Sequence, residues 1–393
     1  MADEFRNGMP GAEQDPVVAT TMHETDRKCP QCGGTMDFDP ATGGLHCPYC
    51  DYNEEIPPVS APSPIPEAHE GSASYIPFGV TADGRASELR FEDAELLENS
   101  DWGLETKTVI CKSCGAESVY EAHVVSAECP YCGSNQVMEA NDAKTMAPGG
   151  VVPFKISQQE ASNRFIGWIK NKFFAPKLAK ESAKADSFKG IYLPYWTFDA
   201  MTRSSYVAEY GKDRKVKDSD GQERTVTDWS KTSGNYEEFF NDELVCGTKQ
   251  HDVNMLRAIE PFNTEENKAY RPEFVAGFAA ERYSVGIKDA WEKAKTSIAE
   301  KIKNGISRKV MREYNADHVT GVRAQTDYSQ RTYKYLLLPV WLSSFRYKDK
   351  VYRFMVNGQT GKVSGNSPVS VPKVILTILV ILAILLLIYY FMG

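Results

Sequence analysis

The sequence predicts an α+β protein: two small four-cysteine ribbons, a duplicated helix-plus-antiparallel-sheet domain, and one C-terminal transmembrane helix. Three observations lead to this prediction. Two cysteine sets share one spacing, two amphipathic helical stretches each precede an aromatic-rich alternating stretch, and the chain ends in an uncharged apolar run. With 393 residues, the chain is long enough for two or three domains.

The composition narrows the function classes. The formal net charge is −8 and the pI is near 5.5, which argues against a general nucleic-acid binder, since such proteins usually contain a strongly basic domain. The N-terminus is polar and has no apolar segment typical of a signal peptide. We therefore expect the nine cysteines to be reduced in the cytosol, where the eight in Cys-x-x-Cys pairs act as metal ligands.

The two cysteine sets have identical spacing. In each set, two Cys-x-x-Cys pairs are separated by fourteen residues, so the ligands are expected to be Cys29, Cys32, Cys47 and Cys50 in the first set and Cys111, Cys114, Cys129 and Cys132 in the second. A Cys-x-x-Cys turn lets two thiolates reach one ion, and the intervening residues suit a short β-hairpin. The repeated spacing also suggests an internal duplication.

Four thiolates from two such turns predict a tetrahedral Zn²⁺ site, with iron or a redox dithiol as alternatives. We expect two structural ions, because four protein ligands leave no position open for a water molecule. His46 and His123 lie near the ligands and are expected at the surface. Cys246 is expected to be a small buried apolar residue without nucleophilic function.

Composition shifts divide the chain into segments. The predicted boundaries are a disordered N-terminus at 1–25, zinc ribbon 1 at 26–53, a proline-rich and acidic linker at 54–105, zinc ribbon 2 at 106–140, an α+β domain with two related halves at 151–365, and a transmembrane helix at 374–392. Five prolines between 57 and 66 make the linker extended, and an acidic helical stretch is expected from Glu88 to Asn99.

The α+β domain contains two predicted helices. The first starts at a capping box formed by Ser157 and Glu160, with Ile156 as a hydrophobic staple. Its expected apolar stripe consists of Phe165, Ile166, Trp168, Ile169 and Phe173. The second covers roughly 287–314, with apolar residues every three or four positions.

Several separate strands are expected around these helices. They cover 191–198, 205–210, 225–229, 335–347 and 351–356, with a closing strand near Lys362 after an Asn357–Gly358 turn. The basic run at 212–217 is expected to be a solvated hairpin tip.

Two similar motifs, Leu193–Trp196 (LPYW) and Leu338–Trp341 (LPVW), each follow a helix that contains a tryptophan. They suggest two related helix-then-sheet units. Both prolines are expected to interrupt a ladder or lie at an edge, and the tryptophans are expected to be core residues.

The C-terminal run Val374–Met392 contains one aliphatic hydroxyl group, that of Thr377, and no charge. As a helix it would span about 28 Å, close to a hydrocarbon core of about 30 Å. A buried core helix would normally keep a polar side, which this run lacks. Lys373 precedes the run and no charge follows it, so the expected location is the cell membrane, single-pass, with the N-terminus cytoplasmic.

No phosphate-binding loop, dinucleotide fingerprint, zinc-protease motif or serine-hydrolase motif is present in the sequence, so we do not expect an enzyme. The chain resembles bacterial membrane-anchored proteins with a TFIIB-type double zinc ribbon, which are often labelled PriA-like, primosomal or phage replication proteins. The motifs behind the resemblance are the two ribbons, Leu193–Phe198, Glu243–Thr248, Phe274–Tyr283, Leu338–Trp341, Tyr352–Gly361 and the tail helix.

Some relatives in this group are linked to membrane-stress modules that contain a phage-shock-type protein and an SPFH protein. The resemblance thus implies a scaffold that brings a cytoplasmic protein partner to the lipid bilayer. The alternative is a membrane-anchored, replication-related nucleic-acid binder. The acidic residues that flank both ribbons argue against this alternative, because they would repel phosphates.

Overall fold

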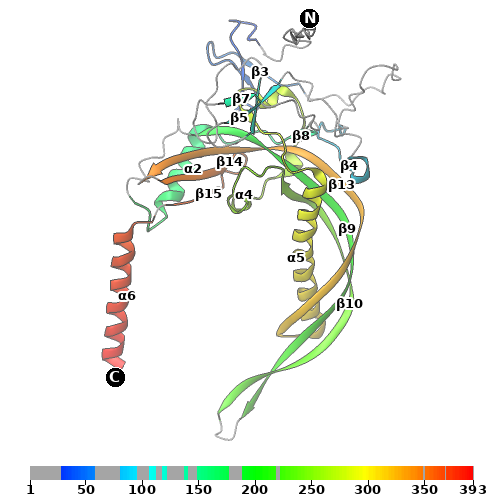
Figure 1. The fold of residues 1–393 in the computed structure, drawn as a ribbon, viewed down its shortest axis with the longest axis vertical. Helices are drawn as coiled ribbons and strands as arrows, with labels where there is room; N and C mark the ends of the chain where they lie inside the picture. The colour runs from blue at the N-terminus through cyan, green and yellow to red at the C-terminus, as the bar shows by residue number, and fades with distance from the viewer. Residues whose placement is uncertain are drawn as a thin grey trace, which may run out of the picture.

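The computed structural model describes residues 28–57, 80–94, 106–111, 117–121, 137–139, 148–176, 188–217, 222–347, 350–367 and 369–392. The expected disordered N-terminus lies outside these residues, as does most of the proline-rich part of the linker. The described part is a mixed α and β structure with a single apolar helix at its C-terminal end (Figure 1).

Two sheets are present among the described residues. The small one contains β1 (Asp37–Asp39), β2 (Gly44–His46) and β3 (Asn53–Glu54). The large one has twelve strands, namely β4 (Leu89–Arg90), β5 (Thr106–Cys111), β6 (Glu117–Glu121), β7 (Val137–Glu139), β8 (Gly150–Val151), β9 (Lys189–Lys217), β10 (Glu223–Cys246), β11 (Lys268–Ala269), β12 (Ala279–Ala280), β13 (His318–Tyr347), β14 (Lys350–Asn357) and β15 (Val363–Gly365).

Four α-helices and three short 3₁₀ helices complete the part that the structure describes. They are α2 (Gln158–Lys170), α4 (Val253–Ile259), α5 (Ile287–Tyr314), α6 (Val371–Met392), η1 (Phe91–Asp93), η3 (Thr264–Glu266) and η4 (Pro272–Val275).

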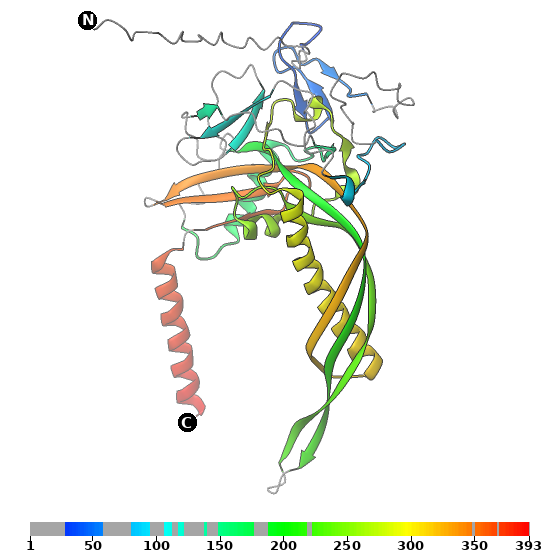
Figure 2. The same ribbon diagram turned by 45° about the vertical axis from the view of Figure 1, so that its right-hand side comes forward.

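Three long strands form a curved arm that projects from the body of the molecule. β9 lies between β10 and β13 and pairs antiparallel with both, and α5 runs along one face of the arm (Figures 1 and 2). The sequence predicts several short strands here, and that prediction is wrong: β9 is continuous over 29 residues and β13 over 30. The expected basic hairpin tip is confirmed as an exposed end of β9.

Helix α5 covers the middle part of β9, between Phe198 and Tyr210. Trp291 contacts Phe198 near the body, and Tyr314 stacks on Tyr210 towards the tip. Between these contacts the helix rises about 35 Å and the strand runs about 40 Å, so the two elements match once the strand twists. The predicted range and apolar face of this helix are confirmed, because its apolar side chains are buried against the sheet.

In the body, the two Leu-Pro-x-Trp motifs lie side by side in the β9–β13 ladder, with Leu193 opposite Leu338. Trp196 donates to the carbonyl oxygen of Val285, just before α5, and Trp341 donates to that of Ile156, just before α2. Each tryptophan thus fixes the start of the helix that belongs to the other predicted unit. This reciprocal arrangement suits two related units, although duplication itself remains a prediction.

The prolines of these motifs lie inside the sheet where a neighbouring ladder stops. The β10 ladder on β9 ends one residue after Pro194, and the β14 ladder on β13 begins one residue after Pro339. A missing N–H is tolerated at such a break, as the sequence analysis predicts. The tryptophans at 196, 291 and 341 are buried, which confirms the prediction for these three, whereas Trp168 is only partly buried against the core.

The first helix is confirmed in its start but not in its full apolar stripe. The Ser157 side chain accepts a hydrogen bond from the Glu160 amide, so Ser157 is the N-cap as expected, while the Glu160 carboxylate pairs with Arg164 instead of completing a capping box. The helix ends at Lys170, however, and Phe173 lies beyond it with 67% of its surface exposed. Assigning Phe173 to the core was therefore wrong.

Part of the predicted linker packs on the body. Residues 80–94 form a short strap across the root of the arm, where β4 pairs with β13. Phe91 of this strap contacts Phe198 and Trp291, and Arg331 lies over the Phe91 ring. Strand β4 and the 3₁₀ helix η1 occupy 89–93 in place of the start of the expected acidic helix, and 95–100 lie outside the described residues.

Candidate metal centre

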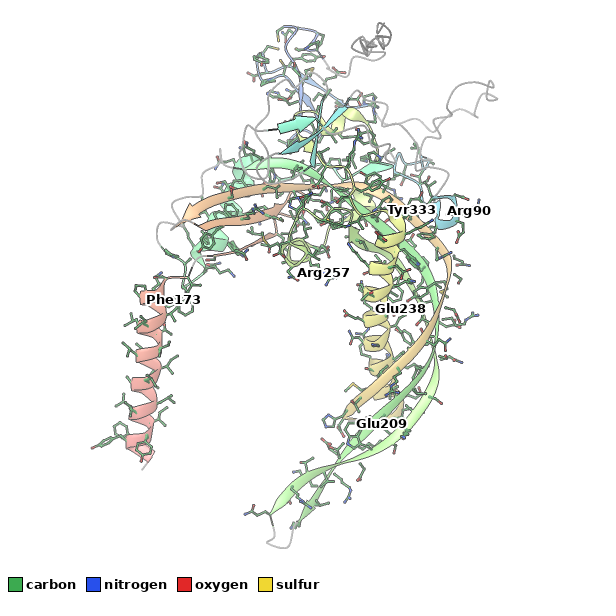
Figure 3. All side chains as sticks on the ribbon, viewed as in Figure 1. Arg90, Phe173, Glu209, Glu238, Arg257 and Tyr333 are labelled. Carbon is green, nitrogen blue, oxygen red and sulfur yellow. The ribbon has the colours of Figure 1, made fainter. Side chains whose placement is uncertain are left out.

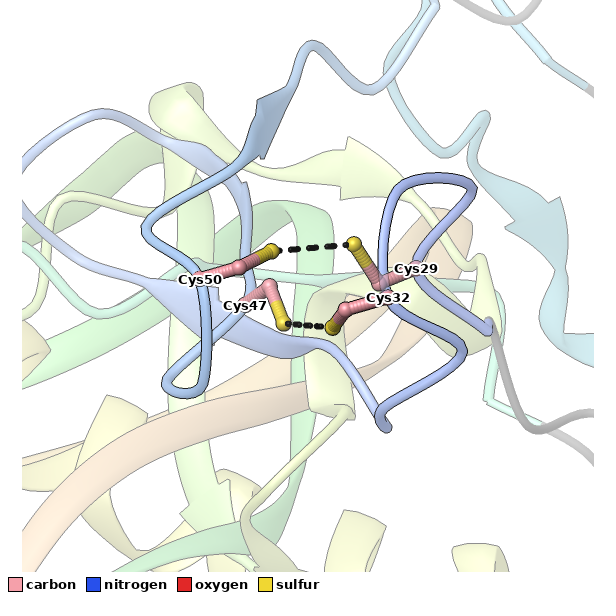
Figure 4. Close-up of side chains that lie close together, drawn as sticks. All are labelled: Cys29, Cys32, Cys47 and Cys50. Carbon is pink, nitrogen blue, oxygen red and sulfur yellow. Dashed lines mark hydrogen bonds between the residues drawn. The ribbon is translucent and has the colours of Figure 1, made fainter.

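Four cysteine side chains of the first ribbon converge on one point (Figure 4). The Sγ atoms of Cys29 and Cys50 are 3.5 Å apart, and those of Cys32 and Cys47 are also 3.5 Å apart. All four lie within 4.8 Å of one another. These distances exclude disulfides, which need about 2.05 Å.

Two backbone turns with the same hydrogen-bond pattern position these cysteines. In the first, the Gly33 amide donates to the Cys29 carbonyl, and in the second the Asp51 amide donates to the Cys47 carbonyl. Gly33 and Asp51 both have left-handed backbone angles, with φ of 76° and 60°. Glycine suits this conformation without a steric penalty, while aspartate is among the few other residues that tolerate it.

The thiol set fits a tetrahedral metal ion. Four sulfur atoms at about 2.3 Å from a central Zn²⁺ are about 3.8 Å apart, close to the sulfur–sulfur distances found here. Although burial raises it, hydrogen bonds from the backbone amides of Cys32 and Gln31 bring the pKa of Cys29 down to about 7. Despite a hydrogen bond from the Tyr52 amide, burial and the neighbouring thiols raise the pKa of Cys50 to about 12, because four close sulfur atoms cannot all be ionised without a cation. The four close cysteines could therefore hold a metal ion, as the sequence analysis expects for this set.

The second cysteine set falls largely outside the described residues. Cys111 ends β5, and its side chain is not among those described, while Cys114, Cys129 and Cys132 lie outside the described ranges altogether. Strands β5, β6 and β7 do form the antiparallel ladder expected of a second ribbon. The second ion therefore remains a prediction. His123 also lies outside, whereas His46 is partly exposed and contacts Asn53.

The first ribbon is docked on the body rather than free on its linker. The Phe38 ring is 3% exposed and packs edge-on against Phe274 and Phe278. The Phe38 amide donates to the Ala276 carbonyl. Gly277 has a φ of 79°, and a Cβ atom on it would lie 2.9 Å from Asp37, so glycine is required where the two parts meet.

The structure also shows a cluster of charged groups that the sequence analysis missed. At the root of the arm, Lys334 lies 3.0 Å from Glu88 and 2.8 Å from Asp242, and the Asp242 amide donates to Asp199. Burial raises the pKa of Asp199 to about 6. Despite opposing burial, hydrogen bonding to Asp199 and the Lys334 ammonium lower the pKa of Glu88.

These groups are far apart in the sequence, so no motif could reveal that they meet. In the structure, the backbone marks this cluster at Asp242, which adopts a φ of 51° at a β-bulge in β10. Bulges and strained residues often mark functional or structurally demanding sites. Here the cluster joins the strap to β9, β10 and β13, which fixes the root of the arm (Figure 3 labels Tyr333 and Arg90 beside it).

Cys246 is partly buried and packs against apolar residues of the body. Burial raises the pKa of its thiol to about 12, so this thiol stays protonated at neutral pH. This agrees with the expectation of a cysteine that is not a nucleophile.

Among the described residues, one helix is long and apolar enough to cross a membrane, namely α6 between Pro372 and Phe391. None of its apolar window is buried inside the structure, so it is not a core helix. It begins on the side of the large sheet opposite the first ribbon (Figures 1 and 2). The alternative of a buried core helix is therefore excluded for this segment.

The chain is similar to the uncharacterized protein YdjG of Bacillus subtilis (strain 168). The two are 28% identical over 356 residues, which cover 88% of this chain and 91% of that protein. No family model matches the chain, and no solved structure matches it. The similarity extends over most of both chains, and the name of the relative specifies no activity.

Proposed function

We propose that this protein is a membrane-tethered zinc-ribbon scaffold that recruits or organises cytoplasmic protein partners at the membrane. One observation supports this proposal above all. The four-thiol site lies on one side of the large sheet and the apolar helix α6 leaves from the other side (Figure 1). A ribbon held in this way would face the cytoplasm while α6 holds the body at the bilayer.

In this proposal the metal is Zn²⁺ with a structural role. Four thiolates are typical of structural zinc sites and leave no coordination position for a substrate. A ribbon of this size cannot bury enough apolar surface to fold alone, so metal binding would supply most of its folding free energy. The second cysteine set would bind a second ion in the same way.

The membrane part of the proposal rests on α6. Its 22 residues exceed the length needed to cross a hydrocarbon core, and their lipid-facing side chains are apolar. Metal-binding cysteines must stay reduced, so the N-terminal part would lie in the cytosol. With α6 as one span, the protein would be a single-pass protein of the cell membrane with a cytoplasmic N-terminus.

A non-catalytic role fits the way in which the charged groups are used. The ammonium of Lys334 is 8% exposed and is occupied by two carboxylates, and Glu243 is paired with Lys301 of α5. The Lys334 pairs stabilise the root of the arm, and the Glu243–Lys301 pair joins β10 to α5. The family resemblance suggests an SPFH or phage-shock-type protein as the partner, which tethering would concentrate at the membrane.

The acidic surface of the first ribbon argues against the nucleic-acid alternative. Among the described residues 28–57, which cover the ribbon and the start of the linker, there are one lysine, Lys28, and five carboxylates, which are Asp37, Asp39, Asp51, Glu54 and Glu55. Phosphate contacts need a basic surface, so this ribbon would repel a nucleic-acid backbone.

A crosslinking pull-down from membranes tests the proposal. Full-length protein would be compared with a variant in which the first ribbon carries Cys→Ser at positions 29, 32, 47 and 50, and with Cys246→Ser as a matched control. We expect defined protein partners to be lost from the ribbon variant and kept by the control. An unchanged partner set would contradict a ribbon-based scaffold, and enrichment of nucleic acid would favour the alternative.

A further inference from the structure

Two adjacent phenylalanines lie exposed just beyond the end of α2. Phe173 is 67% exposed and Phe174 is 39% exposed, and their rings make an edge-to-face contact at 5.2 Å. The backbone turns there, since the Ala175 amide donates to the Lys172 carbonyl, and Ala175 itself is buried. The two rings are thus presented to the outside by an anchored turn, which we call the Phe173–Phe174 patch.

The patch is attached to the first turn of α6. The Ser370 amide donates to the Phe174 carbonyl at 2.8 Å. The Lys373 ammonium donates to the carbonyls of Phe173 and Ala175, both at 3.0 Å, and lies 5.8 Å from the centre of the Phe173 ring. The apolar window of α6 begins at Pro372, so the patch lies level with the start of the candidate span (Figure 3).

The surroundings of the patch are basic, although the chain as a whole is acidic. From residue 164 to residue 180 the sequence contains five basic residues and no acidic one. Of these, Lys170 and Lys172 are exposed beside the patch. In a chain with a net charge of −8, such a stretch is suited to an anionic surface.

We infer that the Phe173–Phe174 patch docks into the interfacial layer of the bilayer, with its rings at the boundary between headgroups and acyl chains and the neighbouring lysines on anionic headgroups. Aromatic rings and lysines are the residues that occupy this layer in membrane proteins. The inference rests on the proposed function only in that α6 spans the membrane. The patch would then act as a second contact beside the span and restrict the orientation of the body.

The direction of the arm bears on this geometry. In the structure α6 and the arm point the same way (Figures 1 and 2), and the arm has charged side chains such as Arg203, Glu237 and Arg214 on its surface. Charged groups are costly in hydrocarbon, so the arm cannot lie beside a membrane-spanning α6. The direction of α6 relative to the arm must therefore differ when the helix spans. The patch contacts Ser370 and Lys373 at the start of α6, so it lies near the point where the helix enters the bilayer.

Site-specific photo-crosslinking to lipid tests the inference. The zinc-loaded full-length protein would be reconstituted into phosphatidylcholine vesicles with and without phosphatidylglycerol. A benzoylphenylalanine would replace Phe173, or Leu382 within α6, or Phe239, which is 55% exposed on the arm and serves as a matched control. Lipid adducts would be quantified by mass spectrometry after irradiation.

We expect lipid adducts at 173 and at 382, with a yield at 239 lower by at least several-fold. With Lys170→Glu and Lys172→Glu, the adducts at 173 should lose their preference for phosphatidylglycerol. Adducts at 382 without adducts at 173 would overturn the inference and leave the membrane anchor intact. Crosslinks from 173 to protein would overturn it in favour of a protein partner. Without adducts at 382, the anchor itself would fail, and the inference with it.

Discussion

Substitution of Phe38 by alanine should release the first ribbon from the body without removing its metal. The Phe38 ring is buried against the rings of Phe274 and Phe278, about 6 Å away centre to centre, and belongs to the core of the body, whereas Met36 and Leu45 pack with the cysteines. Truncating a buried phenylalanine costs about 3 to 5 kcal/mol. Because each 1.4 kcal/mol changes an equilibrium tenfold, the equilibrium constant for docking should fall by about two to three and a half orders of magnitude.

Hydrogen exchange followed by mass spectrometry measures this change directly. We expect faster exchange in peptides covering 36–46 and 271–280, because the amide of Phe38 is then no longer bonded to Ala276. Exchange in α5 and in the middle of β9 should stay unchanged, and the zinc content should be the same as in the wild type. Phe239→Ala is the matched control, since Phe239 is 55% exposed and contacts neither part.

Two results would refute this reasoning. If exchange in the ribbon and the 271–280 segment stays slow, the docking contact does not depend on Phe38. If the zinc content falls together with the protection of the ribbon amides from hydrogen exchange, the ribbon and the metal site form one folding unit. The docking surface is then not separable from the metal centre.

Three further predictions concern the metal centre and the charged cluster. Cys47→Ser should lower the zinc content by one ion per chain in elemental analysis, whereas Cys246→Ser should leave it unchanged. Lys334→Met should lower the free energy of unfolding by about 3 kcal/mol, since it leaves the mostly buried Asp242 carboxylate without its cation. Lys231→Met at an 87% exposed site should have no effect in the same denaturant titration. Burial raises the pKa of Asp199 to about 6 in the folded protein, above about 3.9 for an unfolded aspartate. Its protonated carboxyl therefore stabilises the fold at low pH, and this stabilisation is lost as the pH rises through 6. Asp199→Asn keeps the neutral form, so its stability relative to the wild type should increase between pH 4 and pH 7 in denaturant titrations.

The predictable parts of this structure are those that local sequence specifies. The second helix and the N-cap of the first appear where the periodicity and the capping residue place them, because both signals act within a few residues. The cysteine spacing predicts the metal centre for the same reason, since each Cys-x-x-Cys turn is a local structure. The apolar run at the C-terminus is likewise visible without tertiary information.

What could not be predicted depends on contacts between distant residues. The alternation near 205–210 shows that a strand exists, but the continuity of β9 follows from a helix about one hundred residues away that covers it. Phe173 continues the apolar spacing of α2, yet the helix ends before it and the neighbouring turn binds α6 instead. The charged cluster joins Glu88 to Lys334 across the chain, and single-sequence patterns contain no signal for such a meeting.

The segment 271–285 connects the parts that the sequence divides into separate domains. Arg271 donates to the Pro57 carbonyl at the end of the first ribbon, and Phe274 packs against that ribbon. Further along, Ala280 pairs with both Val119 of the second predicted ribbon and β9.

At its end, Val285 accepts the hydrogen bond of Trp196 at the start of α5. One short segment thus touches both ribbons, the central sheet and the helix of the arm. A partner that binds a ribbon would therefore act on a surface coupled to the arm through packed contacts, whereas a ribbon on a free linker would move independently of it. The family-like motif Phe274–Tyr283 lies in this segment, which gives those residues a physical role as the joint of the molecule.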